Sequence, residues 1–292
     1  MNRTWTVLGL LNWAAPYLEK YGSSSSRLDA ELLLARVLEC PRLELYLRFD
    51  QPLAASELAA FKQLLVRRRE GVPVAYLLGE KEFWSLPFIV NPAVLVPRPE
   101  TEHLVEAAIE FLASGSDRVA RVLDIGTGCG NIILALAHTW TGNGKEFFGL
   151  GTDRRPEALE VARANARRLG IENVVFGVSD LFADLAPEDG SFGLIVSNPP
   201  YIRTADLDTL PPAVRFEPRS ALDGGVDGLE FYRRIAAGAG NFLKPGGGLF
   251  FEVGAEQAAG VKKILASSGY DAISSRYDLA GHERVVGGIK AG

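Results

Sequence analysis

Short apolar runs and amphipathic stretches alternate along the chain from Val119 onward, and this alternation limits the folds that are open to it. Strands are expected at residues 121–124, 146–153, 174–178, 194–197 and 249–253. Helices are expected at residues 131–138, 157–169, 229–241 and 255–268. This order is typical of α/β proteins with a mostly parallel sheet and helices on both faces. Two further strands, at 272–277 and 283–288, would complete a seven-stranded, Rossmann-like sheet with an antiparallel edge.

The first 74 residues instead predict a small helical bundle. Apolar residues recur at helical spacing in three stretches, which are Leu8, Leu11, Ala15 and Leu18, then Leu28, Leu32, Ala35 and Leu38, then Leu58, Phe61 and Leu65. Ser56 is expected to cap the third helix, which would run through Arg69 and end at Gly71. Because no catalytic constellation occurs here, we interpret residues 1–74 as a substrate-docking domain.

Residues 75–97 change character again and predict a β-hairpin. Aromatic and β-branched residues alternate there with prolines, and the turn is expected at residues 91–93. A helix should follow, beginning at Pro99 or Thr101. The hairpin would link the helical domain to a catalytic domain at residues 98–292.

Composition narrows the class of protein. The 292 residues are 47% apolar and carry a net charge of −5, so two packed domains are expected and no general attraction to nucleic acid or anionic membrane. Cys40 and Cys129 have no metal-ligand or disulfide spacing, so no metal site is expected. The sequence shows no signal-peptide pattern and no run long enough to span a membrane, which predicts a cytoplasmic protein. Nothing in the sequence demands more than a monomer.

A glycine-rich loop follows the first predicted strand of the α/β region. The stretch from Val122 to Asp124 leads into Gly126-Thr127-Gly128-Cys129-Gly130, directly before a helix. Glycines let a backbone approach a ligand closely, and a helix start offers free N–H groups. The spacing is G-x-G-x-G, whereas a dinucleotide site favours G-x-G-x-x-G. The loop therefore favours a ligand without a pyrophosphate.

Polar residues at the next strand ends extend this site. Asp153 ends the second strand, at the distance where an acidic side chain can accept both ribose hydroxyls. Asp180 and Leu181 follow the third strand, where they could meet the edge and face of an adenine ring. Each residue alone could be a cap or a turn. Together, the three strand ends predict a nucleoside pocket at the carboxyl edge of the sheet.

The tetrapeptide Asn198-Pro199-Pro200-Tyr201 follows the fourth predicted strand. Two prolines hold the backbone rigid and lack N–H groups. Such a site could hold a planar NH2 group, with the Asn198 oxygen and the Pro199 carbonyl each accepting one hydrogen and Tyr201 covering the face. The tetrapeptide also fits a strand that simply ends in a rigid turn. The three histidines, His103, His138 and His282, are scattered, and we expect structural or surface roles for them.

Several stretches together resemble a known family. Asp153, the glycine loop and Asn198 to Tyr201 are similar to class I S-adenosylmethionine-dependent methyltransferases that act on amide or amino nitrogens. The stretches Pro97-Arg98-Pro99-Glu100-Thr101-Glu102 and Glu217-Pro218-Arg219-Ser220-Ala221-Leu222 narrow this further. With them, the chain resembles the peptide chain release factor glutamine methyltransferases, the HemK/PrmC family, over essentially its whole length.

The resemblance implies a substrate, a cofactor and a set of site residues. The substrate would be the side-chain amide nitrogen (N5) of the glutamine in the Gly-Gly-Gln motif of class I release factors, and the cofactor S-adenosylmethionine. The residues implied to contact the cofactor are Gly126, Thr127, Gly128, Cys129, Gly130, Asp153, Asp180, Leu181 and Asn198, with Cys129 and Leu181 at positions that look variable in the family. Asn198, Pro199, Pro200 and Tyr201 would hold the glutamine.

Other functions remain open from the sequence. An N6-adenine methyltransferase acting on DNA or RNA would use the same planar NH2 group, but it needs a basic groove and a flipped base. Glutamine in a ribosomal protein is another possible target. A non-catalytic S-adenosylmethionine or nucleotide-binding regulator could share the pocket, although the intact Asn-Pro-Pro-Tyr argues against it. A nicotinamide dehydrogenase is disfavoured by the glycine spacing.

Overall fold

The computed structural model describes residues 4–115, 118–186 and 191–291. Contacts between residues divide the chain into two compact units. The first comprises the residues up to 80 together with 209–216, and the second comprises 81–208 and 217 onward. Each unit is described by itself below.

The first unit is helical. Its α-helices are α1 (Val7–Lys20), α2 (Ser26–Val37), α3 (Ala55–Arg69), α4 (Val74–Leu78) and the short α8 (Pro212–Arg215), with a 3-10 helix at Arg42–Leu47. Thr6 caps α1 by accepting the N–H of Gly9 at 3.2 Å. The core of the unit contains Val7, Leu10, Leu11, Ala14, Leu18, Ala30, Leu33, Leu34, Leu45, Phe61 and Leu65. The sequence pattern did not reveal α4 or α8.

The buried face of α2 differs from the expected one. Leu28 is 43% exposed, whereas the charged residues Asp29 and Glu31 are buried. Asp29 accepts hydrogen bonds from Arg68 at 2.8 Å and from Ser23 at 2.7 Å. The prediction of a face containing Leu28 was wrong because buried carboxylates become tolerable when charge-assisted hydrogen bonds compensate them.

Glu31 is satisfied in the same way. It accepts from Arg27 at 2.7 Å, Arg42 at 2.8 Å and the Tyr46 hydroxyl at 2.8 Å. These hydrogen bonds hold the pKa of Glu31 below its usual value, although burial alone raises it. A hydrophobicity pattern cannot foresee such a partner set, because Arg42 and Tyr46 lie outside α2.

The expected cap of α3 was also wrong. Ser56 lies inside the helix, which begins at Ala55 with Ala54 as the N-cap residue. Glu57 provides the capping interaction instead, because its carboxylate accepts the backbone N–H of Ala54 at 2.6 Å. The helix ends at Arg69, two residues before the predicted end at Gly71.

The predicted hairpin exists, but its turn lies elsewhere. Strands β1 (Glu80–Phe83) and β2 (Leu86–Ile89) are joined by Trp84 and Ser85, whose φ angles are 53° and 57°. Two left-handed residues are what a tight hairpin turn requires, but Trp and Ser are not its usual residues. The expected turn at 91–93 is a separate local turn, in which the Asn91 side chain accepts the N–H of Ala93 at 2.8 Å.

The second unit contains a seven-stranded sheet in the order β5-β4-β3-β6-β7-β9-β8. Its strands are β3 (Val119–Ile125), β4 (Glu146–Asp153), β5 (Val174–Val178), β6 (Phe192–Ser197), β7 (Leu243–Glu252), β8 (Tyr270–Tyr277) and β9 (Glu283–Lys290). The pairs from β5 to β7 are parallel, and β9 runs antiparallel to both β7 and β8. The predicted mostly parallel sheet with an antiparallel edge is therefore confirmed.

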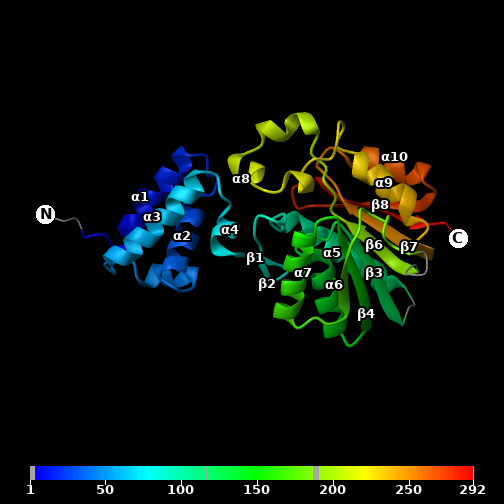
Figure 1. Cartoon of the computed structure of the whole chain (residues 1–292), viewed down its shortest axis with the longest axis horizontal. Coiled ribbons are helices and arrows are strands. Elements are labelled where there is room, and N and C mark those ends of the chain that lie inside the picture. Colours follow the sequence, from blue (N-terminus) through cyan, green and yellow to red (C-terminus); the bar gives the residue numbers. More distant parts are fainter. Residues whose placement is uncertain (1–3, 116–117, 187–190, 292) are drawn as a thin grey trace. The chain divides into compact units, whose positions relative to one another are not determined.

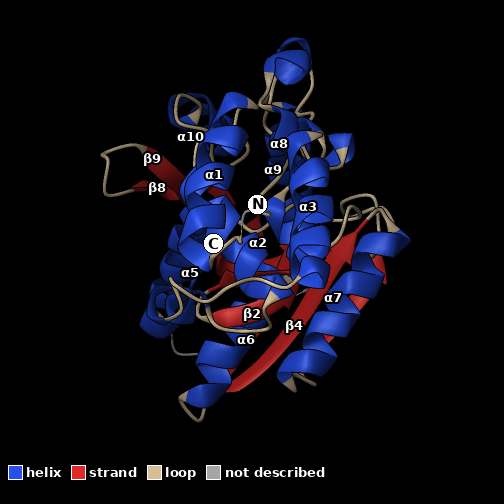
Figure 2. Ribbon diagram, turned by 90° about the vertical axis from the view of Figure 1, so that its left-hand side faces the viewer, coloured by secondary structure: helices blue, strands red, loops and turns tan. Residues whose placement is uncertain are grey.

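Helices cover both faces of this sheet (Figure 1). The helices are α5 (Glu102–Ser114), α6 (Asn131–Gly142), α7 (Pro156–Leu169), α9 (Glu230–Ala239) and α10 (Ala258–Ser267). One apolar layer joins α5 and α6 to alternate residues of the strands, such as Val122 and Val196. The other joins α9 and α10 to the intervening residues, such as Leu123 and Ile195. Figure 2 shows α6 and α7 lying along β4.

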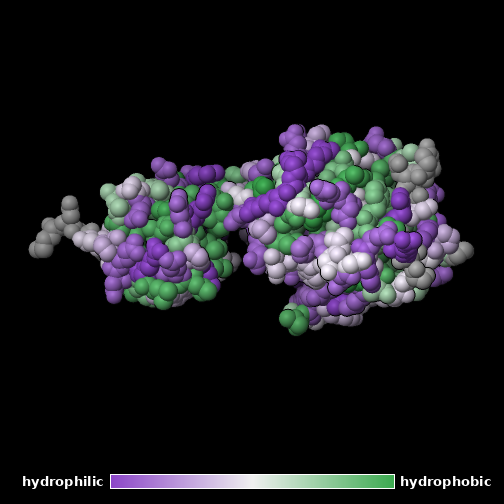
Figure 3. Space-filling view, turned by 90° about the horizontal axis from the view of Figure 1, so that it is seen from below, coloured by the Kyte–Doolittle hydropathy of each residue, from purple (hydrophilic) through white to green (hydrophobic). Residues whose placement is uncertain are grey.

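The surface of each unit is mixed in character. Hydrophilic residues are spread over both units on the face that Figure 3 presents, with hydrophobic patches between them. Within residues 4–115, 118–186 and 191–291, no helix has both the length and the apolar composition to cross a bilayer.

Candidate active site

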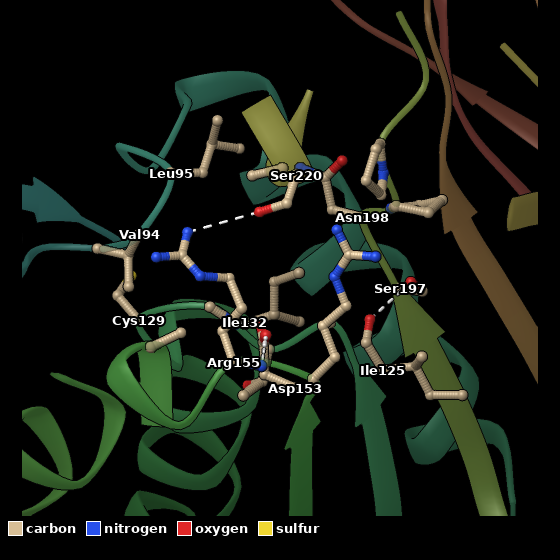
Figure 4. Close-up of a pocket in the computed structure, with 18 of the residues that line it drawn as sticks. Val94, Leu95, Ile125, Cys129, Ile132, Asp153, Arg155, Ser197, Asn198 and Ser220 are labelled. Atoms are coloured by element: carbon tan, nitrogen blue, oxygen red, sulfur yellow. Dashed lines mark hydrogen bonds between the residues drawn. The ribbon is translucent and has the colours of Figure 1, made fainter. Parts of the chain in front are cut away.

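A cavity opens at the carboxyl ends of β3, β4, β5 and β6. Of the residues predicted from the sequence, its walls contain Gly126, Thr127, Gly128, Cys129, Asp153, Asp180, Leu181, Asn198, Pro199 and Pro200. In Figure 4, Val94 and Cys129 lie on one side of this cavity, and Ser197 and Asn198 lie on the other. Parallel strands that end at one edge thus bring together residues separated by more than 70 positions in the chain.

The glycine loop after β3 has the conformation that its sequence demands. Gly126 and Gly128 have φ angles of 72° and 56°, which side chains rarely adopt. A Cβ atom added at Gly126 would meet no other atom within 4 Å, so the backbone there faces open space. Gly130 has a left-handed φ and begins α6 as its N-cap, but it does not line the cavity. The loop therefore exposes backbone to a ligand at one end and starts a helix at the other.

Asp153 connects the second strand end to this loop. One carboxylate oxygen accepts the N–H of Gly128 at 3.1 Å, and the other accepts the N–H of Arg155 at 2.9 Å. Burial raises the pKa of Asp153, and these two backbone hydrogen bonds partly oppose that effect. Because a carboxylate oxygen can accept more than one hydrogen, Asp153 can still receive hydroxyl hydrogens from a ligand in the cavity.

Asp124 stabilises the glycine loop by a hydrogen bond with Thr127. It is fully buried in β3, and its Oδ2 accepts the Thr127 hydroxyl at 2.6 Å. Thr127 in turn donates its backbone N–H to Thr152 at 2.8 Å. Burial raises the pKa of Asp124 to about 7. Asp124 itself does not line the cavity, so its role is to fix Thr127.

The third strand end contributes Asp180 and Leu181. Leu181 has a φ of 56°, and its carbonyl accepts the Ser179 hydroxyl at 2.9 Å, which holds it in this unfavourable conformation. Asp180 is exposed and forms an ion pair with Arg234 at 3.1 Å. A ligand that reached Asp180 would therefore compete with that arginine.

The tetrapeptide begins directly after β6. The Ser197 hydroxyl donates to the carbonyl of Ile125 at 2.7 Å and so fixes the end of β6 to the end of β3 (Figure 4). Asn198 is half-buried at the cavity wall and donates from Nδ2 to the Thr101 hydroxyl at 3.3 Å. This hydrogen bond leaves the amide oxygen of Asn198 free to face the cavity.

Tyr201 lies differently from the three residues before it. It is not among the cavity walls, and its ring packs against the apolar layer that contains α9 and α10. Burial raises the pKa of its hydroxyl to about 12. The Gln257 side chain donates to the Tyr201 carbonyl at 2.9 Å, so this end of the tetrapeptide is held by the segment after β7.

Two segments far apart in sequence cover the cavity. Residues 93–98 and the region around Ser220 both contribute to its walls. Glu217 joins them, because its buried carboxylate accepts the N–H of Val96 at 2.9 Å and pairs with Arg98. Arg155 reaches towards the Ser220 hydroxyl across the cavity, at 3.5 Å (Figure 4).

Several supporting residues were missed in the sequence. Thr101 and Glu217 lie inside the two stretches that narrow the family resemblance, but neither was predicted to support the site. Asn165 was not noticed, although its buried amide contacts the backbone of both Ile89 and Cys129. Glu252 ends β7 as a charged residue in an apolar run, the same pattern that Asp124 shows in β3. That pattern, a buried acid at a strand end, was the available signal.

Comparisons with protein families identify similar domains. A family model described as PrmC N-terminal domain matches residues 9–79, and one described as methyltransferase domain matches residues 116–272. The chain is 44% identical to a release factor glutamine methyltransferase of Geobacter sulfurreducens, over 97% of this chain and 96% of the relative. It is 46% identical to the protein of that name in Vibrio cholerae, over 96% of both chains.

Solved structures show a similar fold. A methyltransferase from Pyrococcus furiosus superposes with a TM-score of 0.51 at 20% identity, over 72% of this chain and 92% of that one. At this identity the likeness concerns the fold alone. It is the class I methyltransferase arrangement that the sequence predicted.

Proposed function

This chain belongs to the family of release factor glutamine methyltransferases, and from that premise we propose how its cavity serves the reaction. The protein is an S-adenosylmethionine-dependent protein-glutamine N-methyltransferase. Its substrate is the side-chain amide nitrogen of the glutamine in the Gly-Gly-Gln motif of class I peptide chain release factors. The observation that carries this assignment to particular residues is that Asn198 and Cys129 of the glycine loop lie on opposite sides of one cavity.

The groups that line the cavity suit the parts of S-adenosylmethionine. The open backbone at Gly126 suits a closely approaching ligand, and Asp153 has acceptor capacity for two ribose hydroxyls. Leu181 and Ile132 offer apolar contact for an adenine ring, and both line the cavity. We assign these residues to the cofactor, together with Thr127, Gly128, Cys129, Asp180 and the supporting Gly130. When bound there, S-adenosylmethionine supplies an electrophilic methyl group.

Asn198 and Pro199 position the glutamine amide. An amide nitrogen is a poor nucleophile because its lone pair is delocalised into the carbonyl group. If the Asn198 oxygen and the Pro199 carbonyl each accept one of its hydrogens, the nitrogen is held with its remaining lobe towards the donor side of the cavity. These hydrogen bonds strengthen as positive charge develops on the nitrogen, so they stabilise the transition state more than the ground state. Pro200 keeps the backbone rigid. Tyr201 remains assigned to the glutamine as part of the tetrapeptide, although its ring packs against the apolar layer of α9 and α10 and not in the cavity wall.

No dedicated general base is required. Once methylated, the nitrogen becomes acidic and can release its proton to water or to a neighbouring acceptor. Within the described residues, His138 and His282 are exposed, His103 lies on α5 beside Glu106, and none lines the cavity. Orientation and exclusion of water are therefore the main contributions of the protein to the rate.

The decisive experiment compares Asn198→Ala with the native protein on purified release factor. Mass spectrometry should find one methyl group on the glutamine of Gly-Gly-Gln with the native protein. Loss of an oriented acceptor should lower kcat by about 100-fold or more, while S-adenosylmethionine affinity, measured by calorimetry, should fall much less. Asn143→Ala, at an exposed position after α6, is the matched control and should behave as the native protein.

Two outcomes would count against this assignment. Equal losses in kcat and in cofactor affinity would make Asn198 chiefly a cofactor residue. Methylation of ribosomal protein or nucleic acid in place of release factor would keep the chemistry and overturn the substrate.

The remaining partner assignments are also part of this proposal. We infer that the helical unit docks the release factor, that the chain works as a monomer in the cytoplasm, and that it binds no nucleic acid stably. The acidic net charge of −5 supports the absence of stable nucleic-acid binding, because such binding generally requires excess basic charge.

A further inference from the structure

The direction of the Asn198 amide decides whether the proposed mechanism works. An amide presents an oxygen at one end and an NH2 group at the other, and the two ends have nearly the same shape. With its oxygen towards the cavity, Asn198 accepts a hydrogen from the glutamine amide. With the amide reversed, two NH2 groups would face each other and repel. Something in the protein must therefore hold one direction.

Glu252 lies in the right place to do so. It is the last residue of β7, the strand that pairs with β6 in parallel, and the register joins Ser197 to Phe251, so Asn198 and Glu252 follow side by side. Glu252 is only 3% exposed, and Thr101 is only 1% exposed. The side chains of both Thr101 and Asn198 lie close enough to the Glu252 carboxyl group to lower its pKa. One Glu252 oxygen, Oε2, has no hydrogen-bond partner among the described residues.

We propose that Glu252, together with Thr101, is a positioning residue that holds the Asn198 amide with its oxygen towards the substrate. An ionised carboxylate can only accept hydrogen bonds, so it fixes the NH2 end of Asn198 on its own side. Thr101 completes the arrangement by accepting from Asn198 Nδ2 at 3.3 Å. The inference rests on the proposed function, because it explains how Asn198 becomes an acceptor for glutamine.

The arrangement makes the orientation sensitive to protonation. A protonated Glu252 could donate its O–H to the Asn198 oxygen, which would permit the reversed amide. Burial and the charge of Glu100 raise the pKa of Glu252, while Thr101, Arg284 and Asn198 lower it, and the net result is a pKa of about 7. Tyr201 and Tyr232 also face this carboxyl group, and burial keeps the pKa of both hydroxyls above the usual value, so they stay neutral. The competent state is therefore the one in which Glu252 is ionised.

Glu252→Gln tests the idea through the pH dependence of catalysis. With the native protein, kcat on release factor should fall by up to about tenfold per pH unit below pH 7, as expected for loss of one required ionised group. The variant should have a lower kcat at pH 8, by about tenfold because a charge-assisted hydrogen bond is lost. Its kcat should no longer change between pH 6 and 8. Cofactor affinity should stay within about twofold of native, since Glu252 does not line the cavity.

Tyr232→Phe is the matched control. The Tyr232 hydroxyl donates to the backbone carbonyl of Glu252 at 2.9 Å, so this change removes a hydrogen bond at the same residue without touching its carboxyl group. It should leave kcat and its pH profile unchanged. An equal loss in Tyr232→Phe would mean that any loosening of β7 lowers activity, and it would overturn the inference.

A second readout does not depend on the substrate. In protein labelled with 15N at asparagine, the Asn198 side-chain amide signals, assigned with Asn198→Ala, should shift with pH around a midpoint near the Glu252 pKa of about 7. They should lose this shift in Glu252→Gln. A native protein that fails to methylate release factor but shows this titration would refute the proposed substrate alone. Amide signals that do not change with pH, or that titrate equally in the variant, would refute the positioning role alone.

Discussion

Asp124 and Glu252 are two carboxyl groups that lie buried at strand ends near the site. Each has one oxygen whose hydrogen-bonding capacity is unused in the described part of the chain. Asp124 Oδ1 and Glu252 Oε2 both lack a hydrogen-bond partner within the described residues. Burial raises the pKa of each to about 7. A buried acid at such a position costs folding free energy when it ionises. We explain its presence in the core by the side chain that it orients, which is Thr127 for Asp124 and Asn198 for Glu252.

Stability should therefore fall as pH rises. The folded protein holds protons on these carboxyls up to about pH 7, whereas their ordinary pKa values are 3.8 and 4.5. Between those limits the folded state binds more protons than the unfolded state, so the free energy of unfolding declines by up to about 1.4 kcal/mol per pH unit for each group. The stabilisation is complete below about pH 4 and is lost as pH passes through 7.

Asp124→Asn tests this directly. Asparagine cannot ionise, yet its side-chain oxygen can still accept the Thr127 hydroxyl. Urea unfolding at pH 5, 6, 7 and 8 should show a smaller decline of the unfolding free energy in the variant, which should be more stable than the native protein at pH 8. Parallel stability curves for the two proteins would show that Asp124 does not carry a raised pKa.

At the scale of elements, Glu217 holds the segment that covers the cavity. It accepts the N–H of Val96 and pairs with Arg98, and both residues precede the 3-10 helix Pro99–Thr101 that leads into α5. Residues 93–98 are therefore held in part by a side chain more than 100 residues later in the chain. The two motifs that contain Arg98 and Glu217 are linked by this contact.

Glu217→Gln should weaken cofactor binding. The change removes the charge that holds Arg98, which remains partly buried, and a broken pair of this kind costs about 2–3 kcal/mol. We expect the Kd for S-adenosylmethionine, measured by calorimetry, to rise by about tenfold or more. Glu146→Gln is the control, since its ion pair with Arg118 is highly exposed and should contribute little. Unchanged cofactor affinity in Glu217→Gln would mean that the covering segment keeps its position without this anchor.

Helices and strands with a strong hydrophobic periodicity could be predicted from the sequence. Turns whose conformation depends on hydrogen bonds to distant residues could not. The bounds of β4 and β5 agree with the sequence pattern, because their apolar runs end at clear polar residues. The hairpin turn was misplaced because Trp84 and Ser85 adopt left-handed conformations that local propensity disfavours. Two hydrogen bonds hold Trp84 in this conformation. Its backbone N–H donates to the Glu102 carboxylate at 2.8 Å, and its indole N–H donates to the Thr139 hydroxyl at 2.8 Å.

The candidate site could be predicted in part. Residues at strand ends were found because parallel strands place them at one edge. The supporting residues Thr101, Asn165 and Glu217 are polar residues whose partners lie far away in the chain, so no local pattern indicates their role. Their hydrogen bonds span from 36 to 121 positions in the chain, and such pairings cannot be inferred from one sequence. The roles given to the site residues stay predictions until the variants are measured.

At the scale of the whole molecule, the two units should respond separately to mutation. Asp29 and Arg68 form a largely buried ion pair in the helical unit. Asp29→Ala leaves the arginine unpaired and should destabilise that unit by about 3–5 kcal/mol. Because we propose that this unit docks the release factor, KM for release factor should rise while the Kd for S-adenosylmethionine stays unchanged.

Asp50→Ala, at an exposed position of the same unit, is the control and should change neither constant. Limited proteolysis would show whether cleavage in Asp29→Ala is confined to the helical unit. Cofactor affinity that falls in step with release-factor affinity would contradict separate responses of the units.

The helical unit is not one continuous stretch of chain. Residues 209–216, which follow β6 and precede α9, belong to it by their contacts. A Cβ atom added at Gly71 would lie 3.1 Å from the Cβ of Pro212, which shows how closely the distant segment packs. The polypeptide therefore leaves this unit after residue 80, returns to it at residue 209 and leaves it again after residue 216. Gene fusion or recombination at a single junction near residue 80 would transfer an incomplete bundle, so replacing the helical unit requires the exchange of two separate coding segments.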